Sequence, residues 1–294
     1  MQILFLILMF VLGAVFGSFL CCQVRRLEAG RSFEGHPQSL RGRSEEPRED
    51  GRDERPEKER QLPSRSICLH CKKQLKWYDN IPIISWLILG GECRYCHKKI
   101  GLAEIISELG LAIAFLSLGT YFLALNGSIT PDFLANFPTI EPMKWAIFIT
   151  TLVFILSLAF LAIYDGLYGE LPIVALVISA AIAIVLAILE AWPEFTAMPI
   201  ASAALFGGIY LILYLISKGK WVGDGDWILA GIIGLALGHP LLSVIALFIA
   251  NLSACIIMFP TVKDKKNHQV YFGPFLVLAF IITYVFSDFF ISMI

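Results

Sequence analysis

Two short acidic motifs lie at the edges of long apolar runs in this sequence. "YDGLYGELP" spans residues 164–172 and contains Asp165, and "WVGDGDWIL" spans residues 221–229 and contains Asp224 and Asp226. Ionised side chains are costly at membrane depth, so those that occur there are rare and often functional. Two carboxylates held close together do not both ionise easily, so at neutral pH one keeps a proton and the other is a base. Such a pair can activate water against a peptide carbonyl and then protonate the leaving amine.

The glycines of the "GDGD" motif, Gly223 and Gly225, would let a substrate strand approach the backbone closely. We expect Asp226 to be the partner of Asp165, and Asp224, between the glycines, to be solvated. On chemistry alone, two other interpretations stay open. The acids could be ordinary loop residues near the lipid headgroups, or the protein could be a proton- or ion-coupled transporter. A transporter is disfavoured because both acids would lie at one face, and because the chain has no obvious inverted repeat and no midplane charge.

A second group of reactive side chains consists of two CxxC pairs. They are Cys68-x2-Cys71 and, 21 residues later, Cys93-x2-Cys96. Each CxxC turn directs two sulfur atoms at one ion, and two such turns at this spacing are typical of tetrahedral four-thiolate zinc. Two disulfides are the alternative, which a cytosolic location disfavours. The sequence therefore predicts a structural zinc site with no open catalytic position, and we expect the adjacent His70 and His97 to face solvent.

The composition is that of a membrane protein. Mean hydropathy is +0.73, and 16% of residues are charged, against about 25% in an ordinary soluble domain. Of the 23 Lys and Arg, 17 lie between Arg25 and Lys99, so a polar segment interrupts a hydrophobic chain. Because acids interleave with these basic residues and the net charge is -1, a nucleic-acid partner is not expected.

The apolar runs must position the acids and cysteines, and a bilayer core takes about 20 apolar helical residues. The sequence predicts an all-helical, polytopic membrane protein with about eight transmembrane helices. They lie near residues 2–23, 103–125, 144–164, 171–191, 198–216, 227–237, 240–259 and 270–292. The run 227–237 is short for a spanning helix. It is counted as a span because the later basic loops then lie on the cytoplasmic side of the membrane. The first run lacks a basic n-region and a cleavage site, so it is predicted to be a retained span rather than a signal peptide.

Basic residues orient such a protein, because they collect on the cytoplasmic side. With the N-terminus outside, 22 of the 23 Lys and Arg are cytoplasmic and only Lys144 lies at an outer boundary. Asp165 and Asp226 then lie at one depth, at the cytoplasmic face.

Four regions follow from this arrangement. They are a first transmembrane helix (1–23), a disordered charged cytoplasmic linker (24–66), a small cytoplasmic four-cysteine zinc module (67–102) and a polytopic membrane catalytic domain (103–294). The linker is predicted to be disordered because it has too few apolar residues to offset the entropy of ordering.

Six stretches, in this order, resemble the type IV prepilin peptidases, which are prepilin leader peptidase/N-methyltransferases and GxGD intramembrane aspartyl proteases of bacterial pilus, type II secretion and competence systems. The stretches are "GAVFGSFL" (13–20), the cysteine module with "WY-NIP--SW" (68–100), "ISELG" (106–110), "YDGLYGELP" (164–172), "GDGD" (223–226) and "YFGPFL" (271–276). The resemblance covers nearly the whole chain except residues 28–64.

The resemblance implies that Asp165 and Asp226 are the catalytic pair, and that the four cysteines bind structural zinc. It implies cleavage of type IV prepilin or pseudopilin leaders after a glycine, at the cytoplasmic face of the bacterial inner membrane. It also implies N-methylation of the new N-terminal residue with S-adenosylmethionine. Expected partners are these substrates and the lipid bilayer. No methyl-donor site is assigned residue by residue, and Glu108 is a candidate for either a polar role or a structural one.

The sequence departs from the family pattern at three positions. Cys21 stands where asparagine is usual, Ile228 where lysine is frequent, and Tyr271 where proline is common. None of these removes a catalytic acid or a zinc ligand. Two alternatives to the bifunctional enzyme therefore stay open, a peptidase without methyltransferase activity and an ion-coupled membrane transporter.

Overall fold

The computed structural model describes residues 2–35, 68, 70–71, 73–125, 141–219, 222–262 and 271–293. Its long helices are α1 (Gln2–Gly35), α3 (Leu102–Leu125), α5 (Pro142–Tyr168), α6 (Ile173–Ala191), α7 (Met198–Ser217), α8 (Asp226–Leu237), α9 (Pro240–Val262) and α10 (Gly273–Val285). Shorter helices are η2 (Trp77–Asn80), α2 (Ile84–Ile88) and α11 (Ser287–Ser292). The predicted all-helical class is confirmed, since these described residues form no strand and only one isolated β-bridge.

The chain is a multi-pass membrane protein, because six of these helices are long and apolar enough to cross a bilayer. The two remaining predicted spans are shorter than expected: α8 has 12 residues and α10 has 13. Helix α8 stops at Gly238, whose φ of 69° is left-handed, and Pro240 opens the next helix. Helix α10 stops at Phe286, and α11 follows it to complete the predicted run 270–292.

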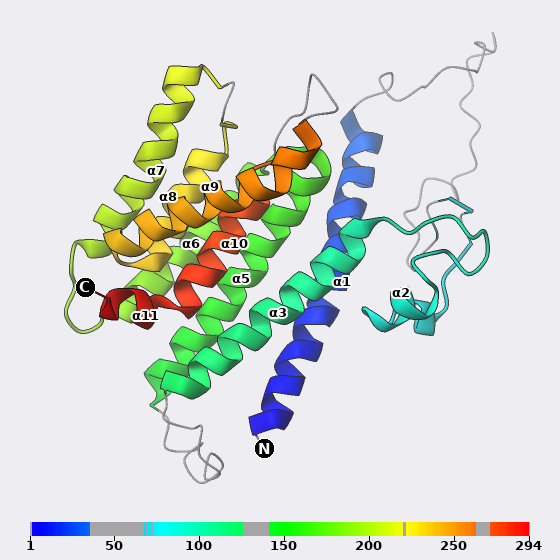
Figure 1. The fold of residues 1–294 in the computed structure, drawn as a ribbon, viewed down its shortest axis with the longest axis horizontal. Coiled ribbons are helices and arrows are strands. Elements are labelled where there is room, and N and C mark those ends of the chain that lie inside the picture. Colours follow the sequence, from blue (N-terminus) through cyan, green and yellow to red (C-terminus); the bar gives the residue numbers. More distant parts are fainter. Residues whose placement is uncertain are drawn as a thin grey trace.

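The long helices run alternately in opposite directions, as Figure 1 shows. Helix α5 ends, and α8 and α10 begin, at the upper side of this view, while the N-terminus lies at the lower side. We call the upper side, where these three helix termini lie, the carboxylate end. The predicted orientation depends partly on the basic residues at 220, 263, 265 and 266. These residues lie outside the described part of the chain, as does Trp221.

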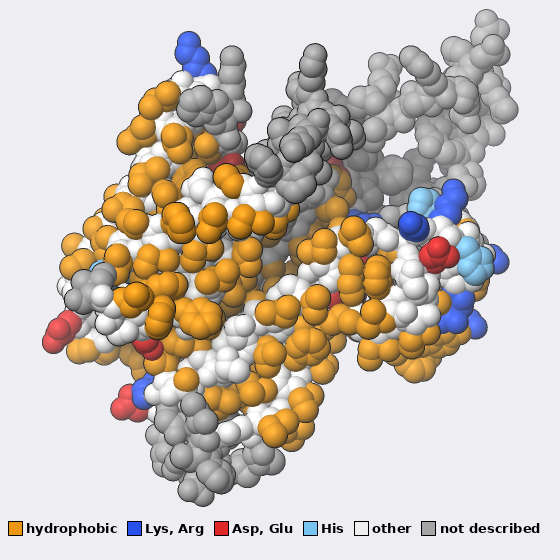
Figure 2. Space-filling model, in the orientation of Figure 1, with side chains coloured by type: hydrophobic (Ala, Val, Ile, Leu, Met, Phe, Trp, Pro, Cys, Tyr) orange, Lys and Arg blue, Asp and Glu red, His pale blue; other side chains and the backbone are white. Residues whose placement is uncertain are grey.

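Apolar side chains fill the space between the helices. The largest fully buried side chains are Tyr164, Tyr210, Phe154, Phe206, Phe280, Leu118, Ile155, Leu158, Leu161, Leu186, Leu229 and Ile233. Figure 2 shows that hydrophobic side chains also cover most of the visible outer face of the bundle, whereas charged side chains gather on the cysteine module and near the helix ends. A surface of this kind is suited to lipid rather than water.

Helix α1 continues through Gly35, beyond the predicted end of the first span at residue 23. The added turns contain Leu27, Glu28 and Ala29, which are good helix formers. Residues 24–35 of the predicted linker are therefore helical. Residues 36–66 lie outside the described part of the chain, so for them the linker stays a prediction.

Helices α1 and α3 pack unusually closely through two glycines of the "GAVFG" motif. A Cβ added at Gly13 would collide with the backbone of Leu111 and Ala112, and one added at Gly17 would collide with the backbone of Ser107 and Glu108. Small residues four apart let membrane helices approach to backbone contact, where van der Waals attraction is strongest. This motif therefore positions α3, which carries the cysteine module at its N-terminal end.

Replacing Gly17 by Ala is expected to lower the unfolding free energy by about 1–3 kcal/mol, because the new methyl group over-packs the α1–α3 contact. Gly110→Ala is the matched control, since it makes the same change in α3 with nothing within 4 Å of the new Cβ. Thermal unfolding of the two variants in detergent measures the difference. Equal unfolding midpoints would show that the close contact contributes nothing to stability.

Candidate active site and metal centre

Asp165 lies in the last turn of α5 and is only 5% exposed. Gly169 ends the helix in the left-handed conformation, with φ of 72°. The Asp165 carboxylate oxygen Oδ2 accepts a hydrogen bond of 2.8 Å from the backbone N–H of Gly273. Gly273 is the first residue of α10, so the carboxylate lies against a helix N-terminus, where free N–H groups and the helix dipole favour negative charge.

Gly273 is required by this contact. A Cβ at this position would come within 2.8 Å of the Asp165 carboxylate and would displace either the acid or the helix. The following Pro274 suits the first turn of a helix, because it needs no N–H partner there. The "FGPF" motif thus has a physical role, because it places the N-terminus of α10 against Asp165 of α5.

Asp226 is the first residue of α8 and is 6% exposed. Its Oδ2 accepts a hydrogen bond of 3.0 Å from the backbone N–H of Gly223, so the "GDGD" loop folds back onto the carboxylate. Gly225 packs against Leu171, which leaves no room for a side chain at position 225. Asp224 is exposed, as predicted.

The two predicted acids lie at the same carboxylate end, where Leu171, in the segment after Asp165, packs against Gly225, the residue before Asp226. Helix α10 packs against both α5 and α8. Tyr210 of α7 lies beside this end, because its ring centroid is 5.5 Å from that of Phe272, the residue before Gly273. Sequence reasoning missed Tyr210, a buried tyrosine in an apolar span, and the Gly273 amide.

One departure from the pattern of the peptidases that the chain resembles has a structural consequence at this site. Tyr271, which stands where proline is common, lies with its ring against Gly169 at the end of α5. A side chain at position 169 would collide with this ring. The ring therefore covers the turn that follows Asp165.

The four cysteines of the two CxxC pairs form one cluster, as the spacing predicted, and their Sγ atoms all lie within 4.8 Å of one another. The Sγ atoms of Cys68 and Cys96 are 3.9 Å apart. A tetrahedron with zinc–sulfur bonds of about 2.3 Å has sulfur–sulfur edges of about 3.8 Å, so the cluster fits zinc. Burial raises the pKa of the Cys68 thiol, but backbone hydrogen bonds at Cys71 and His70 outweigh it and lower the pKa to about 6.

The two cysteine turns have the same local geometry. The N–H of Cys68 donates to the carbonyl of Lys73, and the N–H of Cys93 donates to the carbonyl of Lys98, each at 2.9 Å. His70 and His97 are exposed, in agreement with the prediction that they face solvent.

Glu108 fastens the cysteine module to the membrane helices. It is 7% exposed within α3, and its Oε2 accepts a hydrogen bond of 2.8 Å from the backbone N–H of Ile83. This contact decides between the two roles left open for Glu108 in favour of the structural one. An ion pair of 2.8 Å between Arg25 and Glu104 joins α1 to α3 near the same end of α3.

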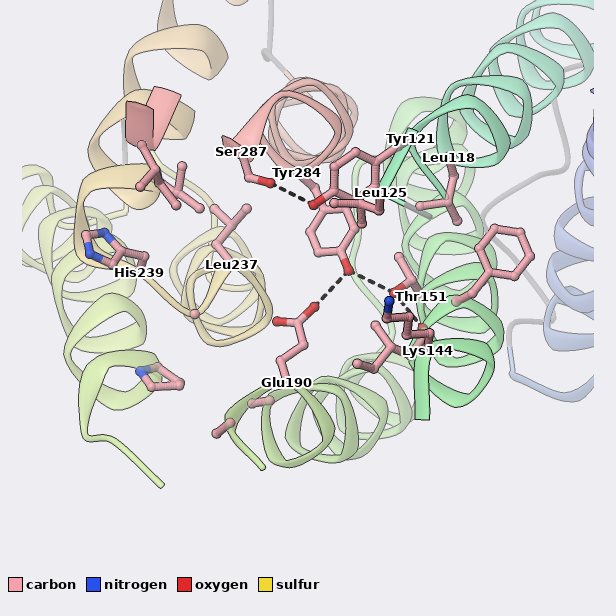
Figure 3. Close-up of a pocket in the computed structure, with 18 of the residues that line it drawn as sticks. Leu118, Tyr121, Leu125, Lys144, Thr151, Glu190, Leu237, His239, Tyr284 and Ser287 are labelled. Carbon is pink, nitrogen blue, oxygen red and sulfur yellow. Dashed lines mark hydrogen bonds between the residues drawn. The ribbon is translucent and has the colours of Figure 1, made fainter. Parts of the chain in front are cut away.

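A separate cavity of about 530 Å³, mostly apolar but with a group of polar side chains, lies at the other end of the bundle, where α6 and α10 terminate. Figure 3 shows Glu190 pointing toward Tyr284. The Tyr284 hydroxyl donates a hydrogen bond of 2.7 Å to Oε1 of Glu190 and lies 3.1 Å from Oγ1 of Thr151. Tyr121 and Ser287 form a neighbouring pair at 3.2 Å. Sequence reasoning gave Glu190 no role, and its only signal was a lone acid in the last turn of an apolar span. Buried apolar residues of α5, α8 and α10 lie between this cavity and the carboxylate end.

Comparison with known proteins supports the resemblance seen in the motifs. Residues 11–122 match the family model described as the bacterial peptidase A24 N-terminal domain. A prepilin leader peptidase/N-methyltransferase of Aeromonas hydrophila is 24% identical over 97% of this chain and 92% of its own length. A protein of the same description from Burkholderia pseudomallei is 28% identical over 94% of this chain and 82% of its own length.

Two other relatives are more similar over shorter segments. A prepilin leader peptidase/N-methyltransferase of Vibrio cholerae is 38% identical, but the alignment covers 21% of this chain and 30% of that protein. A type 4 prepilin-like proteins leader peptide-processing enzyme of Escherichia coli is 48% identical over 19% of its length. A search of solved structures found no significant match.

Proposed function

We propose that this chain, which is similar to prepilin leader peptidase/N-methyltransferases, removes the leader peptide of a type IV prepilin or pseudopilin. The observation that supports this most is that two buried carboxylates, Asp165 and Asp226, lie at the same carboxylate end of the bundle. Each carboxylate accepts a backbone hydrogen bond at Oδ2, from Gly273 and from Gly223. These bonds fix the orientation of the two carboxylates.

In the proposed mechanism, one carboxylate is ionised and the other is protonated, because two buried negative charges at one site repel each other. The ionised carboxylate takes a proton from a water molecule as the water oxygen attacks the scissile carbonyl carbon. The protonated one gives its proton to the leaving nitrogen as the carbon–nitrogen bond breaks. The products are a leader with a new carboxyl group and a mature protein with a free amine. Neither role is assigned to a single residue, because two coupled acids titrate as a pair.

The four cysteines would hold one structural zinc ion, which we propose folds the module between α1 and α3. A module of this size has too little apolar core to be stable alone, and zinc binding supplies the missing free energy. We further propose that the chain methylates the new amine. When bound, S-adenosylmethionine supplies an electrophilic methyl group, which the nitrogen accepts on losing a proton while the donor departs as a neutral thioether.

The cellular location of the protein and the side of the membrane that its site faces follow from the same proposal. A basic prepilin leader stays in the cytosol, so the carboxylate end and the zinc module are proposed to face the cytoplasm from a bacterial inner membrane. The relatives' names favour this enzyme over an ion-coupled transporter. The apolar core between the carboxylate end and the Glu190 cavity also favours it, because ion transport needs a polar path.

The experiment incubates purified protein with a prepilin-like substrate that has a Gly-Phe junction before an apolar helix, with and without S-adenosylmethionine. Mass spectrometry is expected to show cleavage after the glycine in both samples and one added methyl group on the new N-terminus only with the donor. Cleavage without any methylation would establish the peptidase-only alternative. A substrate that stays intact would refute the proposed function.

A further inference from the structure

The cavity of about 530 Å³ opposite the carboxylate end opens on the outer surface of the bundle. Most of its lining is apolar, and two lining residues, Leu125 of α3 and Ile291 of α11, are 51% and 46% exposed. Helices α3, α5 and α6, which supply much of this lining, are each long and apolar enough to cross a bilayer. The volume lies within the range of small-molecule sites, about 300–1,000 Å³. The cavity is therefore accessible from the lipid around the bundle.

Aromatic residues around this cavity place it at the level of the lipid headgroups. Tyr121 and Tyr284 line it, Trp145 lies in the first turn of α5, and the exposed Trp192 directly follows α6. Tryptophan and tyrosine collect at this depth, because their rings are apolar while their N–H and O–H groups bind water or headgroups. A ligand of the cavity would consequently have both a polar headgroup and an apolar part.

Glu190 provides a carboxylate oxygen that no described donor occupies. It is an exposed acid in the last turn of α6, and it points toward Tyr284 of α10 (Figure 3). The Tyr284 hydroxyl donates its hydrogen bond of 2.7 Å to Oε1. Within the described part of the chain, Oε2 has no hydrogen-bond donor and the carboxylate has no ion-pair partner. Ionisable side chains in membrane-spanning helices almost always pair with another group. Oε2 is therefore the atom that a positively charged ligand would meet.

Three hydroxyl groups of the lining already have partners. Oγ1 of Thr151 lies 3.1 Å from the Tyr284 hydroxyl, and it donates a hydrogen bond of 2.8 Å to the carbonyl of Ile147. The hydroxyl groups of Tyr121 and Ser287 form a pair at 3.2 Å. These bonds orient the polar side chains of the cavity and leave the carboxylate oxygen Oε2 as a free acceptor.

Lys144 supplies a positive charge to the same cavity. It lies in the first turn of α5, is exposed, and forms no ion pair with any acid among the described residues, Glu190 included. A lysine ammonium group is a common binder of phosphate, whereas a carboxylate accepts hydrogen bonds from an ammonium group, which has three donors. The two charges thus suit the two parts of one zwitterionic headgroup. A purely anionic lipid would leave Glu190 unpaired, and a quaternary ammonium group would give it no hydrogen-bond donor.

We infer that this cavity is a binding site for a zwitterionic phospholipid with a primary ammonium group, the chemistry of phosphatidylethanolamine. The ammonium group donates to Oε2 of Glu190, the phosphate lies against Lys144, and the acyl chains follow the apolar lining past Leu125 and Ile291. The bound lipid would join α3, α5, α6 and α10 at the end of the bundle that lies away from the two aspartates. The buried apolar core separates the two ends, so lipid binding here does not depend on the proposed leader cleavage.

The test measures lipid binding by native mass spectrometry of the full-length, zinc-loaded protein, which is delipidated in detergent and titrated with one lipid at a time. Phosphatidylethanolamine, phosphatidylcholine and phosphatidylglycerol with the same acyl chains are compared. The first is expected to bind about tenfold more tightly than the other two, since only its headgroup forms a charge-assisted hydrogen bond with Glu190. Equal affinity of the parent protein for the three lipids would overturn the inference.

Glu190→Gln is expected to lower the affinity for phosphatidylethanolamine about tenfold and to leave that for phosphatidylglycerol unchanged. The amide removes the charge, but its oxygen can still accept the hydrogen bond from Tyr284. Lys144→Gln should weaken the binding of both lipids, because both contain a phosphate group. The matched controls are Glu194→Gln and Lys218→Gln, which change exposed residues outside the lining and should bind as the parent protein does.

Thermal unfolding of every variant is measured with and without added lipid, so that a misfolded protein is recognised. Phosphatidylethanolamine should raise the unfolding midpoint of the parent protein more than phosphatidylglycerol does, because a ligand stabilises the folded state that binds it. The comparison of the three lipids on the parent protein needs no variant, so it decides the matter if Glu190→Gln does not fold. A folded Glu190→Gln variant that keeps the preference for phosphatidylethanolamine would overturn the assignment.

Discussion

Asp165→Asn and Asp226→Asn are each expected to lower the rate of leader cleavage by at least about 10²-fold, the lower bound for loss of a general acid or base. Asparagine keeps the shape of the side chain, and its carbonyl oxygen can still accept the hydrogen bond from Gly273 or Gly223. It cannot take up or release the catalytic proton. The loss should therefore appear in turnover, with little change in substrate affinity.

Asp224→Asn is the matched control, because Asp224 lies in the same "GDGD" motif but is exposed. It should cleave at close to the parent rate. Cleavage is measured by gel shift of a prepilin-like substrate in detergent, and the thermal unfolding midpoint and zinc content show that each variant is folded. Equal losses in Asp224→Asn and Asp226→Asn would mean that the loop, rather than the buried acid, matters.

Serine in place of any one cluster cysteine is expected to reduce bound zinc from about one ion per chain to near zero. Three thiolates and a hydroxyl bind zinc much more weakly than four thiolates, and the metal supplies most of the folding free energy of such modules, about 10–16 kcal/mol in zinc-finger peptides. The module should then open to proteases between α1 and α3.

Cys255→Ser provides the matched control, since this exposed cysteine lies in α9 and outside the cluster. Elemental analysis of purified protein gives the zinc content, and limited proteolysis reports the state of the module. Full zinc content in Cys68→Ser or Cys93→Ser would contradict the assignment of these residues as ligands.

Much of the site could be predicted from local sequence patterns. Asp165 and Asp226 stand out because a carboxylate at the edge of an apolar run is rare, and topology then places both at one end. The cysteine cluster follows from spacing alone. Helix boundaries agree to within a few residues for most spans, because hydrophobic length determines them.

Other parts of the site could not be predicted, because they depend on contacts between distant segments. Gly273 and Asp165 are 108 residues apart, and no local pattern indicates that a backbone N–H will meet the acid. The contact between Glu108 and Ile83 exists only once the module is docked on α3. The sequence predicts the short α8 as a span because the charged loops on its two sides then alternate across the membrane. Its length of 12 residues shows that this alternation predicts the direction of a helix better than its length.

The central claim is that Asp165 and Asp226 act as one unit on the scissile bond, and a double-variant cycle tests it most directly. Initial cleavage rates are compared for the parent, for Asp165→Asn, for Asp226→Asn and for the protein that carries both changes. Residues that act together lose their effect once either is removed. The double variant should therefore cleave about as slowly as the slower single variant. Losses that multiply in the double variant, or a single variant that cleaves at the parent rate, would show that the two acids do not form one catalytic pair.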